Sequence, residues 1–172
     1  MKKGELQELI GMLSFASTVV RPGCMFVRRL IDLSTTVSSK HHYVELSAEA
    51  RADLVWWHEY LGSWNGVAII QNWLVSSPDI EFYTDASDLG FGCVFGSEWA
   101  YGSWETGWAG TSINNREAFA IWVAINAWEK RLRNSQVVIH TDSYVNTQTW
   151  KKGSCRDPGV MRMIRPLFTR LV

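Results

Sequence analysis

Two strand-like segments that each end in an aspartate are the feature that most constrains the fold of this 172-residue chain. Residues 80–87 alternate apolar and polar side chains, as a half-buried strand does, and carry Asp85 where the strand meets its turn. A second such segment, 136–141, is followed by Asp142, and a helical pattern over 117–130 lies between them. This strand, helix, strand order predicts two adjacent parallel strands with their acidic ends side by side.

The carboxylates of this region form an ordered set. Glu117 opens the predicted helix, so that Asp85, Glu117 and Asp142 can converge at one point above the sheet. Taken singly, each is more simply explained as a turn former, a helix cap or a charge that stabilises the helix dipole. Together they would repel one another unless a cation neutralised them, and oxygen-only ligands favour Mg²⁺ or Mn²⁺ over zinc. The set therefore predicts a metal site.

Short strands separated by turn residues dominate the rest of this half of the chain. Strand patterns cover residues 80–86, 90–95 and 99–104. Their short connections predict an antiparallel meander, which the strand at 136–141 joins in parallel. The predicted fold class is therefore α/β, with a mixed sheet. A short helix over 144–150 follows, and a last helix is predicted to start at Asp157-Pro158, with Asp157 as its cap, and to run to the terminus.

The first part of the chain is helical by pattern. Apolar stripes and cap residues predict helices over 4–20, 25–33 and 48–61. We therefore expect two domains: a helical segment over residues 1–70 and the sheet domain over residues 78–172.

Composition excludes several classes of function. The formal net charge of zero argues against an indiscriminate binder of polyanions. No segment approaches the roughly 20 apolar residues of a membrane span. Three cysteines without paired spacing favour reduced thiols and an intracellular location, cytoplasmic or nuclear.

The three acidic segments resemble motifs of the ribonuclease H family. Residues 83–87 (Tyr-Thr-Asp-Ala-Ser) resemble its first-strand motif, 114–117 (Asn-Asn-Arg-Glu) its helix-entry motif and 141–143 (Thr-Asp-Ser) its fourth-strand motif. The resemblance implies a ribonuclease H-like fold and two-metal cleavage of the RNA strand of an RNA–DNA hybrid. In that scheme Asp85 would bridge both ions, Mg²⁺ or Mn²⁺, while the other two carboxylates hold one of them.

The helix-entry segment supplies candidates for nucleic-acid contact. Bacterial-type family members usually have one more residue between the Arg and the Glu of this motif. The resemblance implies that Asn114, Asn115 and Arg116, together with Ser143, contact the hybrid, whose 2′-hydroxyls distinguish RNA from DNA. The alternative for the helix-entry residues is a hydrogen-bonded loop that leads into the helix.

Segments before residue 65 resemble parts of a reverse transcriptase. Residues 6–13 and 28–33 look like a thumb, and residues 46–53 look like the connection helix that precedes ribonuclease H in retroelements. DIRS-like, tyrosine-recombinase retrotransposons are the most similar. A polymerase Tyr-x-Asp-Asp turn is absent from the sequence.

The last 30 or so residues depart from the family pattern. Ribonucleases H normally continue with a final strand and a helix that carries a fourth carboxylate. After Asp142 this chain has only two predicted helices, so the last strand, last helix and fourth carboxylate are expected to be missing. The strand at 136–141 would then be an exposed sheet edge that invites pairing with another chain.

Two functions from different classes follow. The first is a retroelement-derived RNA–DNA hybrid endoribonuclease of the ribonuclease H type, impaired by the missing carboxylate. The alternative is a catalytically degenerate, domesticated fragment that serves as a protein- or nucleic-acid-binding or assembly module. Its partner would be nucleic acid, another chain or a second copy bound through the exposed sheet edge.

Overall fold

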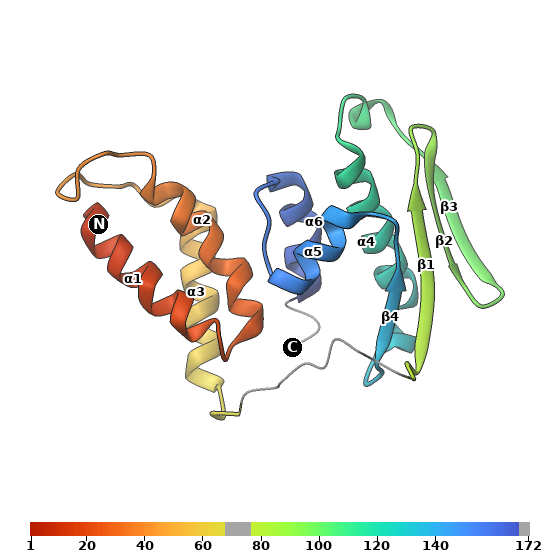
Figure 1. The fold of residues 1–172 in the computed structure, drawn as a ribbon, viewed down its shortest axis with the longest axis horizontal. Coiled ribbons are helices and arrows are strands. Elements are labelled where there is room, and N and C mark those ends of the chain that lie inside the picture. The colour runs from red at the N-terminus through yellow and green to blue at the C-terminus, as the bar shows by residue number, and fades with distance from the viewer. Residues whose placement is uncertain (68–76, 169–172) are drawn as a thin grey trace. The chain divides into compact units, whose positions relative to one another are not determined.

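A computed structural model describes residues 1–67 and 77–168 of the protein. The chain divides into two compact units, Met1–Ile70 and Gln71–Val172. The elements of both units are labelled in Figure 1. Within the described residues, no helix is long and apolar enough to cross a membrane.

The first unit is built from helices. They are α1 (Lys3–Ala16), the short 3₁₀ turn η1 (Arg21–Gly23), α2 (Cys24–Ser34) and α3 (Ala48–Ser63). The predicted helix over 4–20 is too long at its end: α1 stops at Ala16. The hydroxyls of Ser17 and Thr18 donate to the carbonyls of Leu13 and Phe15, and such local bonds compete with continued helix.

Aromatic packing joins α2 to α3. The Trp56 ring stacks between Phe26, at a centroid distance of 4.0 Å, and Tyr60, at 4.9 Å. Trp57 is buried against Gly23, where an added Cβ would lie 2.2 Å from the indole ring, so only glycine fits there. The side chain of Ser47 caps α3 by accepting a hydrogen bond from the Ala50 N–H.

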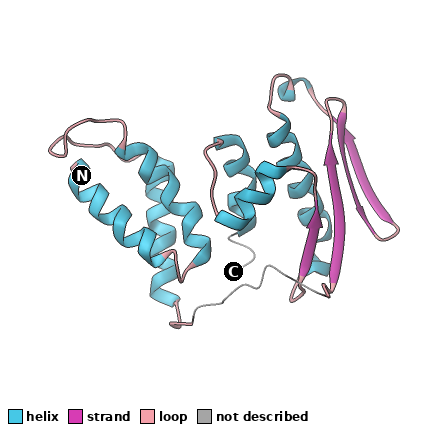
Figure 2. Ribbon diagram, viewed as in Figure 1, coloured by secondary structure: helices cyan, strands magenta, loops and turns pink. Residues whose placement is uncertain are grey.

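The second unit contains a four-stranded mixed sheet. Its strands are β1 (Ile80–Ala86), β2 (Gly90–Phe95), β3 (Glu98–Ser103) and β4 (Val137–His140), in the order β3-β2-β1-β4. The first three strands form an antiparallel meander, and β4 pairs with β1 in parallel. The predicted α/β fold with a meander and a parallel strand is therefore confirmed, and β4 is an edge of the sheet that the described residues form (Figure 2).

Helices cover one face of this sheet. They are α4 (Ile113–Leu132), α5 (Tyr144–Lys152) and α6 (Pro158–Phe168), with the 3₁₀ turn η2 (Thr106–Trp108) before α4. Figure 1 shows all three α-helices on the same side of the sheet. The core between them includes the buried side chains of Phe82, Cys93, Ile121, Trp128 and Leu167. Among the described elements of this unit, no helix covers the opposite face of the sheet.

The helix ends correct one sequence prediction and confirm another. α4 begins at Ile113 rather than Glu117, because the side chain of Ser112 caps it by accepting a hydrogen bond from the Asn115 N–H. α6 is described to Phe168, and the predicted extension over 169–172 lies outside the described residues. The cap at Asp157 is confirmed, since its Oδ1 accepts hydrogen bonds from two N–H groups of the first turn.

Truncating Phe82 tests the core. Its ring is fully buried between β1 and α4 and contacts Trp128 at a centroid distance of 5.8 Å. Phe82→Ala is expected to lower the free energy of unfolding by about 3–5 kcal/mol, because it removes apolar contact and leaves a cavity. Chemical denaturation measures this loss. Leu89→Ala, at a side chain 85% exposed, is the control and should change stability by less than about 0.5 kcal/mol.

Candidate metal centre

The three predicted carboxylates meet at one end of the sheet. Asp85 is the penultimate residue of β1, Asp142 follows β4 by two residues, and Glu117 projects from α4. One oxygen of each lies within 4.8 Å of the others. Parallel pairing of Tyr83 with His140 aligns the two strand ends, so that each aspartate comes two residues beyond the last aligned pair. The sequence prediction that these side chains converge is met in the structure.

Glu117 is the buried member of the cluster. It lies in the second turn of α4, and only 3% of its surface is exposed, whereas Asp85 and Asp142 are exposed. Its Oε1 accepts a hydrogen bond of 3.1 Å from the Ala86 N–H, and its Oε2 has no hydrogen-bond partner among the described residues. A buried oxygen without a partner is costly, so this atom is suited to bind a cation.

The surroundings of Glu117 oppose its negative charge. Burial, the largest cause, together with the carboxylates of Asp142 and Asp85 raises the pKa of Glu117 to about 7, against the lowering effect of the Ala86 N–H. A divalent cation would reverse this balance by favouring the ionised form. The donor set therefore fits a hard cation: three carboxylates, two of them open to solvent and one with an orphaned oxygen.

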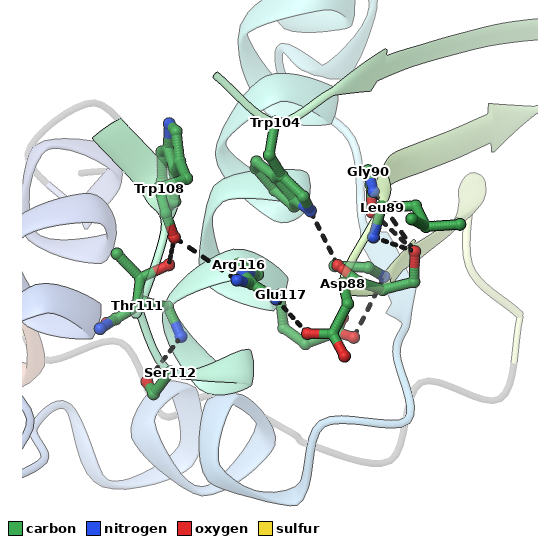
Figure 3. Close-up of polar contacts among 12 residues, drawn as sticks. Asp88, Leu89, Gly90, Trp104, Trp108, Thr111, Ser112, Arg116 and Glu117 are labelled. Carbon is green, nitrogen blue, oxygen red and sulfur yellow. Dashed lines mark hydrogen bonds and ion pairs between the residues drawn. The ribbon is translucent and has the colours of Figure 1, made fainter. Parts of the chain in front are cut away.

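Arg116 fastens the helix entry to the turn that follows β1. Only 9% of its surface is exposed, and its guanidinium pairs with Asp88 and donates to the carbonyl of Trp108 at 3.4 Å. Figure 3 shows these contacts with Glu117 directly beside them. Arg116 also lies over the Trp104 ring, 5.9 Å from its centroid. Asp88, the Trp108 carbonyl and the Trp104 ring therefore hold Arg116 in place, next to Glu117 in the sequence.

The turn between β1 and β2 is fixed from within as well. The Ser87 hydroxyl accepts hydrogen bonds from the N–H groups of Leu89 and Gly90, and the Trp104 indole donates to the Ser87 carbonyl at 2.7 Å. An added Cβ on Gly90 would lie 2.3 Å from the Gly102 carbonyl oxygen of β3. The end of the turn therefore packs too closely on β3 for any side chain at this position. Asp88 lies in this turn and also carries the ion pair to Arg116.

The other predicted site residues lie close to the cluster but form internal contacts. Ser143 is buried, and its hydroxyl accepts hydrogen bonds from the backbone N–H and the side-chain amide of Asn146. The same amide donates to the Asn114 carbonyl. Asn115 packs on Gly159, where a Cβ would lie 2.4 Å from its Oδ1. Nucleic-acid contact by these residues and by Arg116 stays a prediction.

Sequence reasoning missed the groups that position the carboxylates. The Ala86 N–H and the Ser112 cap belong to loops and strand ends, where the partner is decided by tertiary contact. Only the Ser112 signal could have been found, because a serine before an apolar helical pattern is a common cap.

Within the described residues, the cluster has three carboxylates and no fourth. Asp85, Glu117 and Asp142 are the only group there of three or more potential ligand residues with their ligand atoms gathered together. Asp88 is engaged by Arg116, and Asp157 caps α6. The expected shortage of a fourth ligand stays a prediction.

Comparisons with known proteins leave the family open. No protein-family model and no curated protein matches the chain. Among solved structures, it is similar to the foamy viral protease-reverse transcriptase dRH in complex with double-stranded DNA, with 12% identity and a TM-score of 0.39. The match covers 96% of this chain and 30% of that one. At that identity and TM-score, the likeness establishes neither family nor function.

The pKa of Glu117 predicts how pH affects the metal-free protein. Its ordinary value is 4.5 and its value in the fold is about 7, so in that range the folded state keeps a proton that the unfolded state has released. The contribution of Glu117 to stability therefore falls as pH rises from about 4.5 to about 7. In Glu117→Gln this contribution is absent.

The measurement is the melting temperature of both proteins in a metal chelator from pH 4.5 to 8. The difference between variant and wild type should grow in favour of the variant as pH rises, since glutamine cannot ionise. A difference that does not change with pH would contradict the raised pKa.

Proposed function

We propose that this protein is a retroelement-derived ribonuclease H-like domain that binds an RNA–DNA hybrid and cleaves its RNA strand with Mg²⁺ or Mn²⁺. The observation that carries the proposal is the convergence of three carboxylates, Asp85, Glu117 and Asp142, with a buried glutamate oxygen left unpartnered. The motifs around these residues support it, because they resemble the ribonuclease H motifs in order and in secondary structure.

Each carboxylate would have its own part in holding cations. Glu117 is held rigidly, since the Ala86 N–H occupies one oxygen and leaves the other for a cation. Asp85 and Asp142 are exposed, so their oxygens can face a cation and a substrate phosphate at the same time. A bound divalent cation would supply an activated water and stabilise the attacking and leaving oxygens of the phosphodiester.

Cleavage by this chain is expected to be weak. Three carboxylates hold one cation well, but within the described residues none is left to complete a second site. Two-metal hydrolysis needs both cations to stabilise the attacking and the leaving oxygen. A partner that supplies a further carboxylate would then raise the rate.

A second candidate function rests on the edge of the sheet. β4 pairs with β1 on one side, and no other described strand pairs with its other side. Unpaired N–H and C=O groups on an edge strand are a template for pairing with another chain. A binding or assembly module without catalysis would use this edge and would not need the carboxylates.

Metal titration with a labelled RNA–DNA hybrid tests the proposal. Mg²⁺ and Mn²⁺ binding and cleavage are measured together for the wild type and for Asp85→Asn. The substitution keeps the side chain's size but removes its charge, so cleavage should be lost and metal affinity should fall at least about tenfold. Asp32→Asn, at an exposed ion pair in the first unit, is the control and should change neither.

The outcomes separate the two functions. Metal binding and cutting that both disappear in Asp85→Asn support the nuclease. Metal binding without cutting in the wild type favours the binding or assembly module. Metal affinity that is the same in wild type and Asp85→Asn would show that the carboxylate cluster is not the metal site.

A further inference from the structure

The uncovered face of the sheet carries exposed rings beside the carboxylate cluster. Side chains alternate along β1, so Tyr83 and Asp85 point to the uncovered face while Phe82 points into the core. Tyr83 is 55% exposed, and its ring stacks on the His140 ring of β4 at a centroid distance of 4.4 Å. On β3, Tyr101 is 73% exposed on the same face.

Strand register brings Asp85, Gly92 and Tyr101 into one row, while Tyr83 lies in the neighbouring row with Val94. Asp85 pairs with Gly92 of β2, and Gly92 pairs with Tyr101 of β3. Residues that pair across strands share a face, so Gly92 lies between the carboxylate and the tyrosine. Tyr83 lies two residues from Asp85 along β1, a rise of about 7 Å.

Gly92 leaves a gap in this row. A Cβ built on Gly92 would meet no heavy atom within 4 Å, and the glycine has no positive φ that would explain its use. The space above it belongs to an open pocket with a volume of about 1040 Å³. This pocket is also lined by Tyr83, Tyr101, Asp85 and Asp142. The open slot over Gly92, with the Tyr101 ring in its row and the Tyr83 ring in the neighbouring row, thus adjoins two of the proposed metal ligands.

The lining of this surface carries carboxylates and rings but no cationic side chain. Neither lysine nor arginine is among its residues. It cannot track a phosphate backbone by charge, as most nucleic-acid surfaces do. What the rings offer is stacking, which depends little on sequence because every base has a flat face.

We infer that the slot over Gly92 takes an unpaired nucleobase of the strand whose phosphate lies at the carboxylate cluster, with Tyr83 and Tyr101 as its stacking partners. This rests on the proposed function, since the cluster needs its cation to accept a phosphate. It deepens that function by naming a substrate feature: a hybrid that carries an unpaired nucleotide next to the reacting phosphate. Tyr101 borders the slot within the row of Gly92, and Tyr83, whose other face is stacked on His140, borders it from the neighbouring row.

The test uses the full chain with Mg²⁺ and two fluorescein-labelled probes, a short oligothymidine and an abasic oligomer of the same length. DNA probes avoid cleavage of an RNA strand during the measurement. Binding is followed by fluorescence anisotropy. The wild type should bind oligothymidine more tightly than the abasic oligomer, by at least about fivefold, because only the former can stack.

Three variants locate the effect. Tyr83→Ala and Tyr101→Ala remove the rings and should each lose most of the preference for oligothymidine. Gly92→Val keeps both rings but fills the slot with a side chain that strands accept, and it should lose the preference too. Tyr101→Phe keeps the ring and should retain it. Tyr43→Ala, at a tyrosine 73% exposed in the first unit, is the matched control and should behave as the wild type.

Mg²⁺ binding, measured by calorimetry without any oligonucleotide, distinguishes failure of the inference from failure of the proposed function. The base-stacking inference would be overturned if the wild type bound the two probes equally, or if its preference survived in Gly92→Val and both alanine variants. Mg²⁺ binding by the wild type would still support the metal site in that case. If the wild type does not bind Mg²⁺, the proposed function is overturned instead. Self-association that disappears in Tyr101→Ala, seen by analytical ultracentrifugation, would assign the ring face to protein docking and overturn the inference.

Discussion

The parallel pairing of β4 with β1 is the interaction on which the rest of the site depends. α4 carries the chain from the end of β3 back along the sheet, so that β4 runs parallel to β1. The C-terminal ends of these two strands therefore lie side by side. Asp85 and Asp142 are neighbours for this reason alone, although 56 residues lie between them in the sequence. Burial of Glu117 on the helix that makes the connection completes the cluster.

The cluster is supported by hydrogen bonds and an ion pair that join α4 to the end of β1, and the Ala86 N–H donates to both Asp85 and Glu117. Arg116 joins α4 to the turn after β1 through Asp88, and the Ala86 N–H at the start of that turn holds one oxygen of Glu117. The helix entry and the strand end are therefore fixed to each other on both sides of the site. Such rigidity matters for a cation site, because ligands that are already in place lose less freedom on binding.

The two faces of the sheet differ in what they can do. The face under α4 and α6 is an apolar core built around Phe82 and Trp128. The other face carries Tyr83, Tyr101 and Trp99 in exposed positions, next to the carboxylates. Alternation along each strand separates these roles, so one set of residues stabilises the fold while the other is available to a ligand.

The sequence by itself determined the class of fold, the identity of the three carboxylates and the order of the elements that carry them, because strand and helix periods and turn residues are local signals. The start of α4 was misplaced by four residues, since Glu117 was taken for the first turn and the cap at Ser112 was overlooked. Only the tertiary structure decided that Glu117 is buried with one oxygen unpartnered, that Arg116 pairs with Asp88, and that Gly92 lies between Asp85 and Tyr101. These depend on which residues meet across strands and helices far apart in the sequence, and no local pattern encodes such contacts.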